Sequence, residues 1–132
     1  MLDVSETAVR KCSELFRGDK TKSFAVYSNK IFTDTEQALH GDLTLSLDVI
    51  YHLTDAVVYE EYMHHLFMSS GRFVIIYAWD VNSNKISHVQ HRQFTKWIAQ
   101  HDIGWRLRAQ IKNDALPGAC DFYIYEKYSD HN

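Results

Sequence analysis

Apolar and polar residues alternate along this chain in short blocks that predict strands and helices in turn. The β-prone runs are Ser23–Tyr27, Leu43–Leu47, Arg72–Ala78, Trp105–Ile111 and Asp121–Tyr125. Apolar residues at helical spacing predict helices that begin near Ser5, Thr54 and Gln93, and a short helix is expected over Asp34–Leu39. Strands that alternate with helices indicate an α/β fold with helices on both faces of one sheet.

Three further features refine this fold. Arg72–Ala78 is almost continuously apolar, which is typical of a strand covered on both faces. The last two strands have no helix between them and are expected to pair antiparallel. Asp80–Ser87 is polar and is expected to be a loop, while Met1–Val4 is too short to predict a strand alone.

The helix that begins near Thr54 has the clearest amphipathic pattern. Glu60, Glu61, His64 and His65 tend toward its polar face. Its apolar face is predicted to comprise Val57, Val58, Tyr62, Met63, Leu66 and Phe67.

Composition limits the classes of function. The 132 residues are 45% hydrophobic and 14% aromatic, as expected for a single folded domain over residues 1–132. A net charge of -3 argues against nucleic acid as a partner. No apolar run is long enough to cross a membrane, and no signal-peptide pattern precedes the domain. We therefore expect a cytoplasmic protein in which Cys12 and Cys120 are buried free thiols.

The most informative motif is the run from Leu43 to Leu53. A short apolar strand ends at Leu47 and is followed by Asp48, then by Tyr51 and His52, just before a helix start. Sites in α/β proteins form at the carboxyl ends of strands, so this motif predicts a site. A second acid, Asp3, stands in a similar place before the first helix.

The element order and four segments together resemble the class I S-adenosylmethionine-dependent methyltransferases, from the second strand of that family onward. The resembling segments are Leu2–Val9, Leu45–Leu53, Arg72–Tyr77 and His88–Trp97. The resemblance implies a three-layer Rossmann-like sheet, mostly parallel, with a C-terminal antiparallel hairpin. It also implies S-adenosylmethionine as cofactor and methyl transfer to a small-molecule acceptor.

The same resemblance assigns roles to residues. Asp3 would accept the hydrogen bonds of the cofactor's ribose, and Leu47 and Asp48 would border its methionine end. Ser28 and Asn29 stand where the family often has an acid on the adenine side. The acceptor side would comprise His52 as a general base, with Tyr51, His88, His91 and Arg92.

The sequence departs from the family at its start. The family's first strand and glycine-rich turn should precede Asp3, and the strand lies in the middle of the family's sheet. The two strands beside it would therefore pair directly, stay unpaired or recruit a strand from another chain, which favours a homodimer. An alternative function is a non-catalytic, truncated fold that binds a partner. A coding segment upstream of Met1 could also supply the missing strand.

Each site residue also has a purely structural alternative. Asp3 could be a surface acid, Asp48 could cap a turn, and His52 could pack against the following helix. His88 and His91 could hold zinc with His101 or Asp102 as a third ligand. No cysteine pair or His-Glu signature completes such a set, so no metal is predicted.

Overall fold

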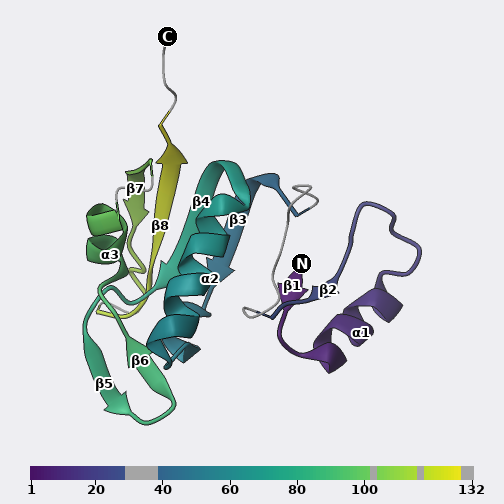
Figure 1. Cartoon of the computed structure of the whole chain (residues 1–132), viewed down its shortest axis with the longest axis horizontal. Helices are drawn as coiled ribbons and strands as arrows, with labels where there is room; N and C mark the ends of the chain where they lie inside the picture. Colours follow the sequence, from purple (N-terminus) through teal and green to yellow (C-terminus); the bar gives the residue numbers. More distant parts are fainter. Residues whose placement is uncertain (29–38, 102–103, 116–117, 129–132) are drawn as a thin grey trace. The chain divides into compact units, whose positions relative to one another are not determined.

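The structure, a computed structural model, describes residues 1–28, 39–101, 104–115 and 118–128 (Figure 1). The chain divides into two compact units, Met1–Thr35 and Glu36–Asn132. The helix predicted over Asp34–Leu39 lies, apart from Leu39, outside the described residues. The two units are described separately below.

The first unit is a small βαβ arrangement. Its elements are β1 (Leu2–Asp3), α1 (Glu6–Leu15) and β2 (Ala25–Val26). The two strands are parallel, with Asp3 opposite Val26, so the short segment at Met1–Val4 does form a strand. Ser5 caps α1, because its Oγ accepts the Ala8 N–H at 3.2 Å. Cys12 in α1 is free, as predicted, but only half-buried.

The second unit holds a four-stranded sheet, a hairpin and two α-helices. Its elements are β3 (Gly41–Leu47), a 3₁₀ turn η1 (Ile50–His52), α2 (Ala56–Met68), β4 (Ser70–Ala78), β5 (Ser83–Ile86), β6 (Val89–His91), α3 (Phe94–His101), β7 (Trp105–Ile111) and β8 (Asp121–Lys127). The sheet order is β3-β4-β8-β7. β3 and β4 are parallel, and β8 is antiparallel to both β4 and β7. The α/β class and the C-terminal antiparallel hairpin are confirmed.

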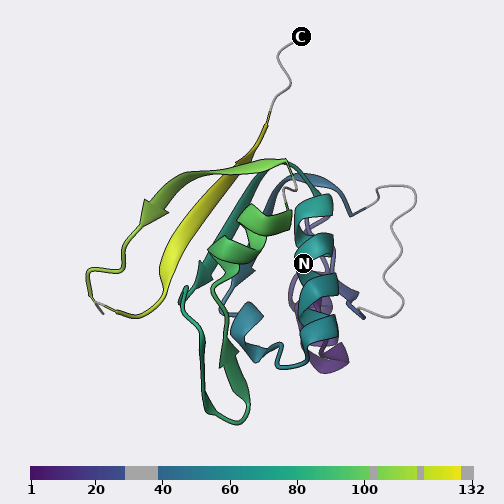
Figure 2. The same cartoon turned by 60° about the vertical axis from the view of Figure 1, so that its left-hand side comes forward.

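Both helices of this unit pack on one face of the sheet, as Figure 2 shows. The ring centroid of Phe94 on α3 lies 4.9 Å from that of Tyr123, and Phe67 on α2 lies 5.8 Å from Tyr125. Tyr123 and Tyr125 are two apart on β8, so their side chains share a face. The remaining core residues are Ile50, Tyr59, Met63, Leu66, Val74, Ile76, Ala78, Trp97, Ile98 and Trp105.

β3 turns its polar side toward α2. The hydroxyl of Thr44 donates to the backbone oxygen of Leu66 at 3.0 Å, and Tyr62 donates to the buried Ser46 at 2.9 Å. The three leucines of this strand are 46–54% exposed: Leu43, Leu45 and Leu47. The apolar half of the alternating pattern therefore faces away from α2.

Two sequence expectations were wrong in this unit. The stretch Asp80–Ser87, expected to be a loop, contributes β5 to an antiparallel hairpin with β6. Val57, expected in the core, is 64% exposed in the first turn of α2. Tyr59 takes the buried place instead and contacts Trp97 edge-on.

The way in which the strands of the two units would pair stays a prediction. The helices that the structure describes are all too short or too polar to cross a bilayer. The cytoplasmic location stays a prediction.

Candidate functional site

The parallel strands β3 and β4 end side by side, and the residues just beyond them form a cluster. Leu47 closes β3 opposite Tyr77 of β4. The next residue, Asp48, donates its N–H to the backbone oxygen of Tyr77 at 3.1 Å. This bond ties the backbone at the start of the turn to the neighbouring strand.

Asp48 adopts an unusual backbone conformation. Its φ of 57° lies in the left-handed region, which aspartate and asparagine tolerate better than other non-glycine residues. The reversal directs the chain from β3 into η1, where Tyr51 follows. Burial, the negative charge of Asp48 and a hydrogen bond to its carboxylate raise the pKa of Tyr51. Tyr51 therefore stays protonated and donates to Asp48.

Aromatic rings and imidazoles gather around Tyr51. Its ring centroid lies 4.4 Å from that of His52 and 5.2 Å from that of His91. The Trp79 ring, just past β4, contacts His91 edge-on at 5.1 Å. The structure thus brings together three predicted acceptor-side residues, from η1 and β6, with Asp48.

His91 is held in its neutral form. Burial, and secondarily the neighbouring His52, lower the pKa of His91 below its usual value. Its Nδ1 atom is buried and has no hydrogen-bond partner among the residues that the structure describes. A neutral imidazole with an unengaged ring nitrogen can accept or donate a proton or hold a polar ligand.

Cys120 borders the same cluster from the start of β8. Burial and the charges of Asp48 and Asp121 raise the pKa of the thiol. Cys120 therefore stays protonated and is a poor nucleophile. It is free, as predicted, but half-buried and not fully buried.

Arg92 and His88, both predicted on the acceptor side, occupy different surroundings. Arg92 donates from Nη1 to the Leu53 oxygen at 2.6 Å and from Nη2 to the Thr54 oxygen at 2.9 Å. Its guanidinium also lies 4.4 Å from the centre of the Tyr59 ring. His88 is exposed in the turn between β5 and β6.

Two hollows adjoin this cluster. His91 and Arg92 line one of about 320 Å³, together with Asn82, Ser83 and Gln90. The other, of about 400 Å³, shares Asn82, Gln90 and Arg92 with it and extends to Glu60 and Trp97. Sequence reasoning identified the strand-end residues but missed these hollows, because they depend on the β5–β6 hairpin.

The predicted cofactor residues of the first unit lie at the carboxyl edge of β1 and β2. Asp3 Oδ1 accepts the Ser5 N–H at 2.8 Å, an arrangement that orients the carboxylate at the turn into α1. Ser28 follows β2 at the same edge and is half-buried. Asn29 lies outside the described residues.

Solved structures with the same arrangement decide the fold. The N-methyltransferase NodS from Bradyrhizobium japonicum WM9, in complex with S-adenosylhomocysteine, matches with a TM-score of 0.71 at 15% identity. This match covers 97% of the chain and 65% of NodS. The chain has the fold of the class I methyltransferases.

Other structures with the class I methyltransferase fold are similarly close. The methyltransferase domain of the bacterial CtHen1-C has a TM-score of 0.66 at 18% identity, over 97% of this chain and 76% of that one. The magnesium protoporphyrin IX methyltransferase ChlM from Synechocystis PCC 6803, with bound S-adenosylmethionine, has a TM-score of 0.65 at 16% identity, over 96% of this chain and 58% of ChlM. Neither a family profile nor a curated protein sequence matches the chain.

Proposed function

We propose that this protein is an S-adenosylmethionine-dependent methyltransferase that acts on a small-molecule acceptor. The observation that carries the proposal is the cluster of Asp48, Tyr51, His52 and His91 at the carboxyl ends of β3 and β4. Class I structures that the chain matches bind S-adenosylmethionine or S-adenosylhomocysteine. The chain spans 65% of the length of NodS and 58% of that of ChlM.

The chemistry of the cluster fits this cofactor, which supplies an electrophilic methyl group on a sulfonium. The sulfonium and the ammonium of the methionine part are cationic. The Asp48 carboxylate attracts such cations, and the rings of Tyr51 and Trp79 offer faces for cation–π contact. In the proposed role Asp48 and Leu47 border the methionine part. Asp3 takes the ribose hydroxyls, and Ser28 and Asn29 lie on the adenine side.

The acceptor would meet the histidines. Methyl transfer is an in-line displacement that needs alignment above all, and a base only when the nucleophile must lose a proton. His52 remains our proposed base. His91 lies beside Tyr51 and lines the hollow, so it is placed to orient the acceptor. His88 and Arg92 complete the proposed acceptor side.

Two observations favour a small acceptor. The hollow lined by His91 has about 320 Å³, the size of a small-ligand pocket. The net charge of -3 offers no general attraction to a polyanion. One of the matching structures is a small RNA methyltransferase, HEN1, of which this chain covers 20%. RNA is therefore the competing class of acceptor that an experiment should include.

Calorimetry with S-adenosylhomocysteine tests the proposal. We expect saturable binding that Asp48→Asn weakens by about tenfold or more, because a charged hydrogen-bonding partner is worth about 1.5–3 kcal/mol. Asparagine keeps the tolerance for positive φ, so the variant removes charge without adding backbone strain. Asp3→Ala should also weaken binding.

The matched control is Asp42→Asn, at the opposite end of the same strand. It should bind like the unmodified protein. Absence of binding at millimolar ligand would contradict the proposal and favour the partner-binding alternative. Equal loss in Asp42→Asn and Asp48→Asn would show a general effect of charge, and would contradict the assigned site.

We also propose a homodimer. Within the four-stranded sheet of the second unit β3 is an edge strand, and an edge strand can pair with a second copy of the chain. Size-exclusion chromatography with light scattering should give twice the chain mass of 15.5 kDa. A well-folded monomer would contradict it.

A further inference from the structure

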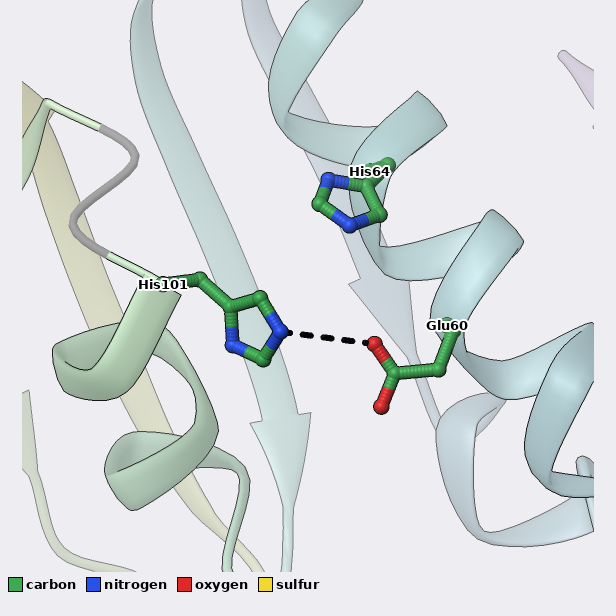
Figure 3. Close-up of side chains that lie close together, drawn as sticks. All are labelled: Glu60, His64 and His101. Carbon is green, nitrogen blue, oxygen red and sulfur yellow. Dashed lines mark ion pairs between the residues drawn. The ribbon is translucent and has the colours of Figure 1, made fainter.

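Three potential metal ligands meet where α2 and α3 pack together (Figure 3). Glu60 and His64 lie one turn apart on α2, and His101 is the last residue of α3. One ligand atom from each lies within 4.8 Å of the other two. The Nε2 atom of His101 is 3.6 Å from Oε2 of Glu60. Sequence reasoning considered His101 as a zinc ligand, but with His88 and His91 instead of Glu60 and His64.

The imidazole of His101 is oriented as a metal ligand would be. Its Nδ1 atom is 2.8 Å from the backbone oxygen of Trp97. A carbonyl oxygen only accepts hydrogen bonds, so Nδ1 must carry the hydrogen. In the neutral ring the lone pair is then on Nε2, which faces Glu60. Histidine ligands commonly hold their second ring nitrogen in this way, by donating it to a carbonyl.

Trp97 organises all three side chains from the core. Its Nε1–H donates to Oε2 of Glu60 at 2.7 Å and so orients the carboxylate. Its ring stacks on that of His101, with centroids 4.1 Å apart, and contacts His64 edge-on at 5.2 Å. Because Trp97 is only 8% exposed, this support is fixed by packing. The ligands are therefore held near one another before any ion arrives.

A direct ion pair explains the cluster less well. The 3.6 Å between Glu60 and His101 is longer than a good hydrogen bond. A second imidazole, that of His64, lies 5.7 Å from His101 between ring centroids. In tetrahedral zinc sites with bonds of about 2.0–2.1 Å, neighbouring ligand atoms are roughly 3.3 Å apart. Zinc binding would therefore draw the three ligand atoms, which lie within 4.8 Å of one another, closer together.

We propose that Glu60, His64 and His101 bind a first-row divalent transition-metal ion, Zn²⁺ in the first place. Two imidazoles and one carboxylate suit Zn²⁺ and its neighbours, whereas Mg²⁺ and Ca²⁺ prefer oxygen ligands alone. Water would fill the remaining coordination position. The metal site needs no cofactor or acceptor, so this proposal does not depend on the methyltransferase proposal.

Zinc titration of the chelator-treated full chain tests the site. We expect saturable binding that Glu60→Gln, His64→Gln and His101→Gln each weaken by about tenfold or more, since each removes a ligand. Glu60→Gln keeps an acceptor for Trp97, so its fold should be intact by circular dichroism. The matched control is His65→Gln, the next residue on the same helix, which should bind zinc unchanged.

X-ray absorption of the zinc-loaded protein gives a second measure. The spectrum should show two imidazoles in the first shell of the bound ion and one fewer in His101→Gln. Zinc affinity that is unchanged in the triple Gln variant would overturn the proposal. So would equal weakening by His65→Gln, or a first shell without imidazole.

Discussion

The two faces of the four-stranded sheet are both largely apolar but differ in how deeply their side chains are buried. On the face toward α2 and α3, Val74 and Ile76 are fully buried, and Tyr123 and Tyr125 are nearly so. On the opposite face the paired residues are also apolar but accessible: Leu43, Leu45, Leu47, Ile75 and Phe122. Apolar composition alone therefore does not identify the covered side of this sheet.

β3 shows the reason most clearly. Its inner side carries Thr44 and Ser46, whose hydroxyls are satisfied by α2, while its leucines face outward. Small side chains let the helix approach closely, and their hydrogen bonds offset the burial of polar atoms. Packing on the inner face is thus part polar and specific, while the outer face of β3 is apolar and accessible.

The largest expected effect is on the inner face. Phe94→Ala removes a fully buried ring from between α3 and Tyr123 and should lower the free energy of unfolding by about 3–5 kcal/mol. Urea unfolding followed by circular dichroism measures it. A loss below about 1 kcal/mol would mean that α3 does not pack on this face in solution.

A smaller loss should follow from Tyr62→Phe. The change removes the hydrogen bond that Tyr62 donates to Ser46, and the buried Ser46 hydroxyl loses this partner. The free energy of unfolding should fall by about 1–2 kcal/mol. Adding Ser46→Ala should restore part of the stability, because both polar groups are then gone. Additive losses in this double-mutant cycle would exclude a direct bond between the two hydroxyls.

Tyr59→Phe should act in the opposite direction. Tyr59 is 2% exposed, and its hydroxyl has no hydrogen-bond partner among the described residues. Burial also raises its pKa, so the group stays neutral. Removing the hydroxyl should stabilise the protein by about 1 kcal/mol in the same unfolding experiment. Destabilisation would reveal a partner, such as bound water.

The smallest effect is expected on the outer face. Leu45→Ala should cost less than about 1 kcal/mol, because Leu45 is 54% exposed. The same substitution at Leu66, only 8% exposed on α2, should cost about 2–5 kcal/mol. Equal losses at the two leucines would show that the outer face is covered in solution.

Strong periodicity made most of the sheet predictable. The runs at Leu43–Leu47 and Trp105–Ile111 form strands, and the absence of a helix before Asp121 implied the antiparallel pair. The β5–β6 hairpin was missed because its first strand, Ser83–Ile86, is rich in polar residues that favour turns.

The candidate sites were predictable to different degrees. Asp48, Tyr51 and His52 are close in sequence, so a strand-end pattern identified them together. The proposed metal site was not recognised, although His101 was considered as a zinc ligand. Glu60 and His64 have the i,i+4 spacing of one helix face, but nothing in the sequence pairs them with His101. That contact depends on the packing of α3 against α2, where Trp97 contacts Tyr59 and Glu60.

Arg92 has a mechanical consequence. One guanidinium at the end of the β5–β6 hairpin holds the backbone oxygens of Leu53 and Thr54 and lies over Tyr59 of α2. The hairpin, the segment after η1 and the start of α2 are therefore linked through one side chain. Any motion that separates the hairpin from the segment after η1 must first break both of these hydrogen bonds, so this one side chain restrains the hairpin.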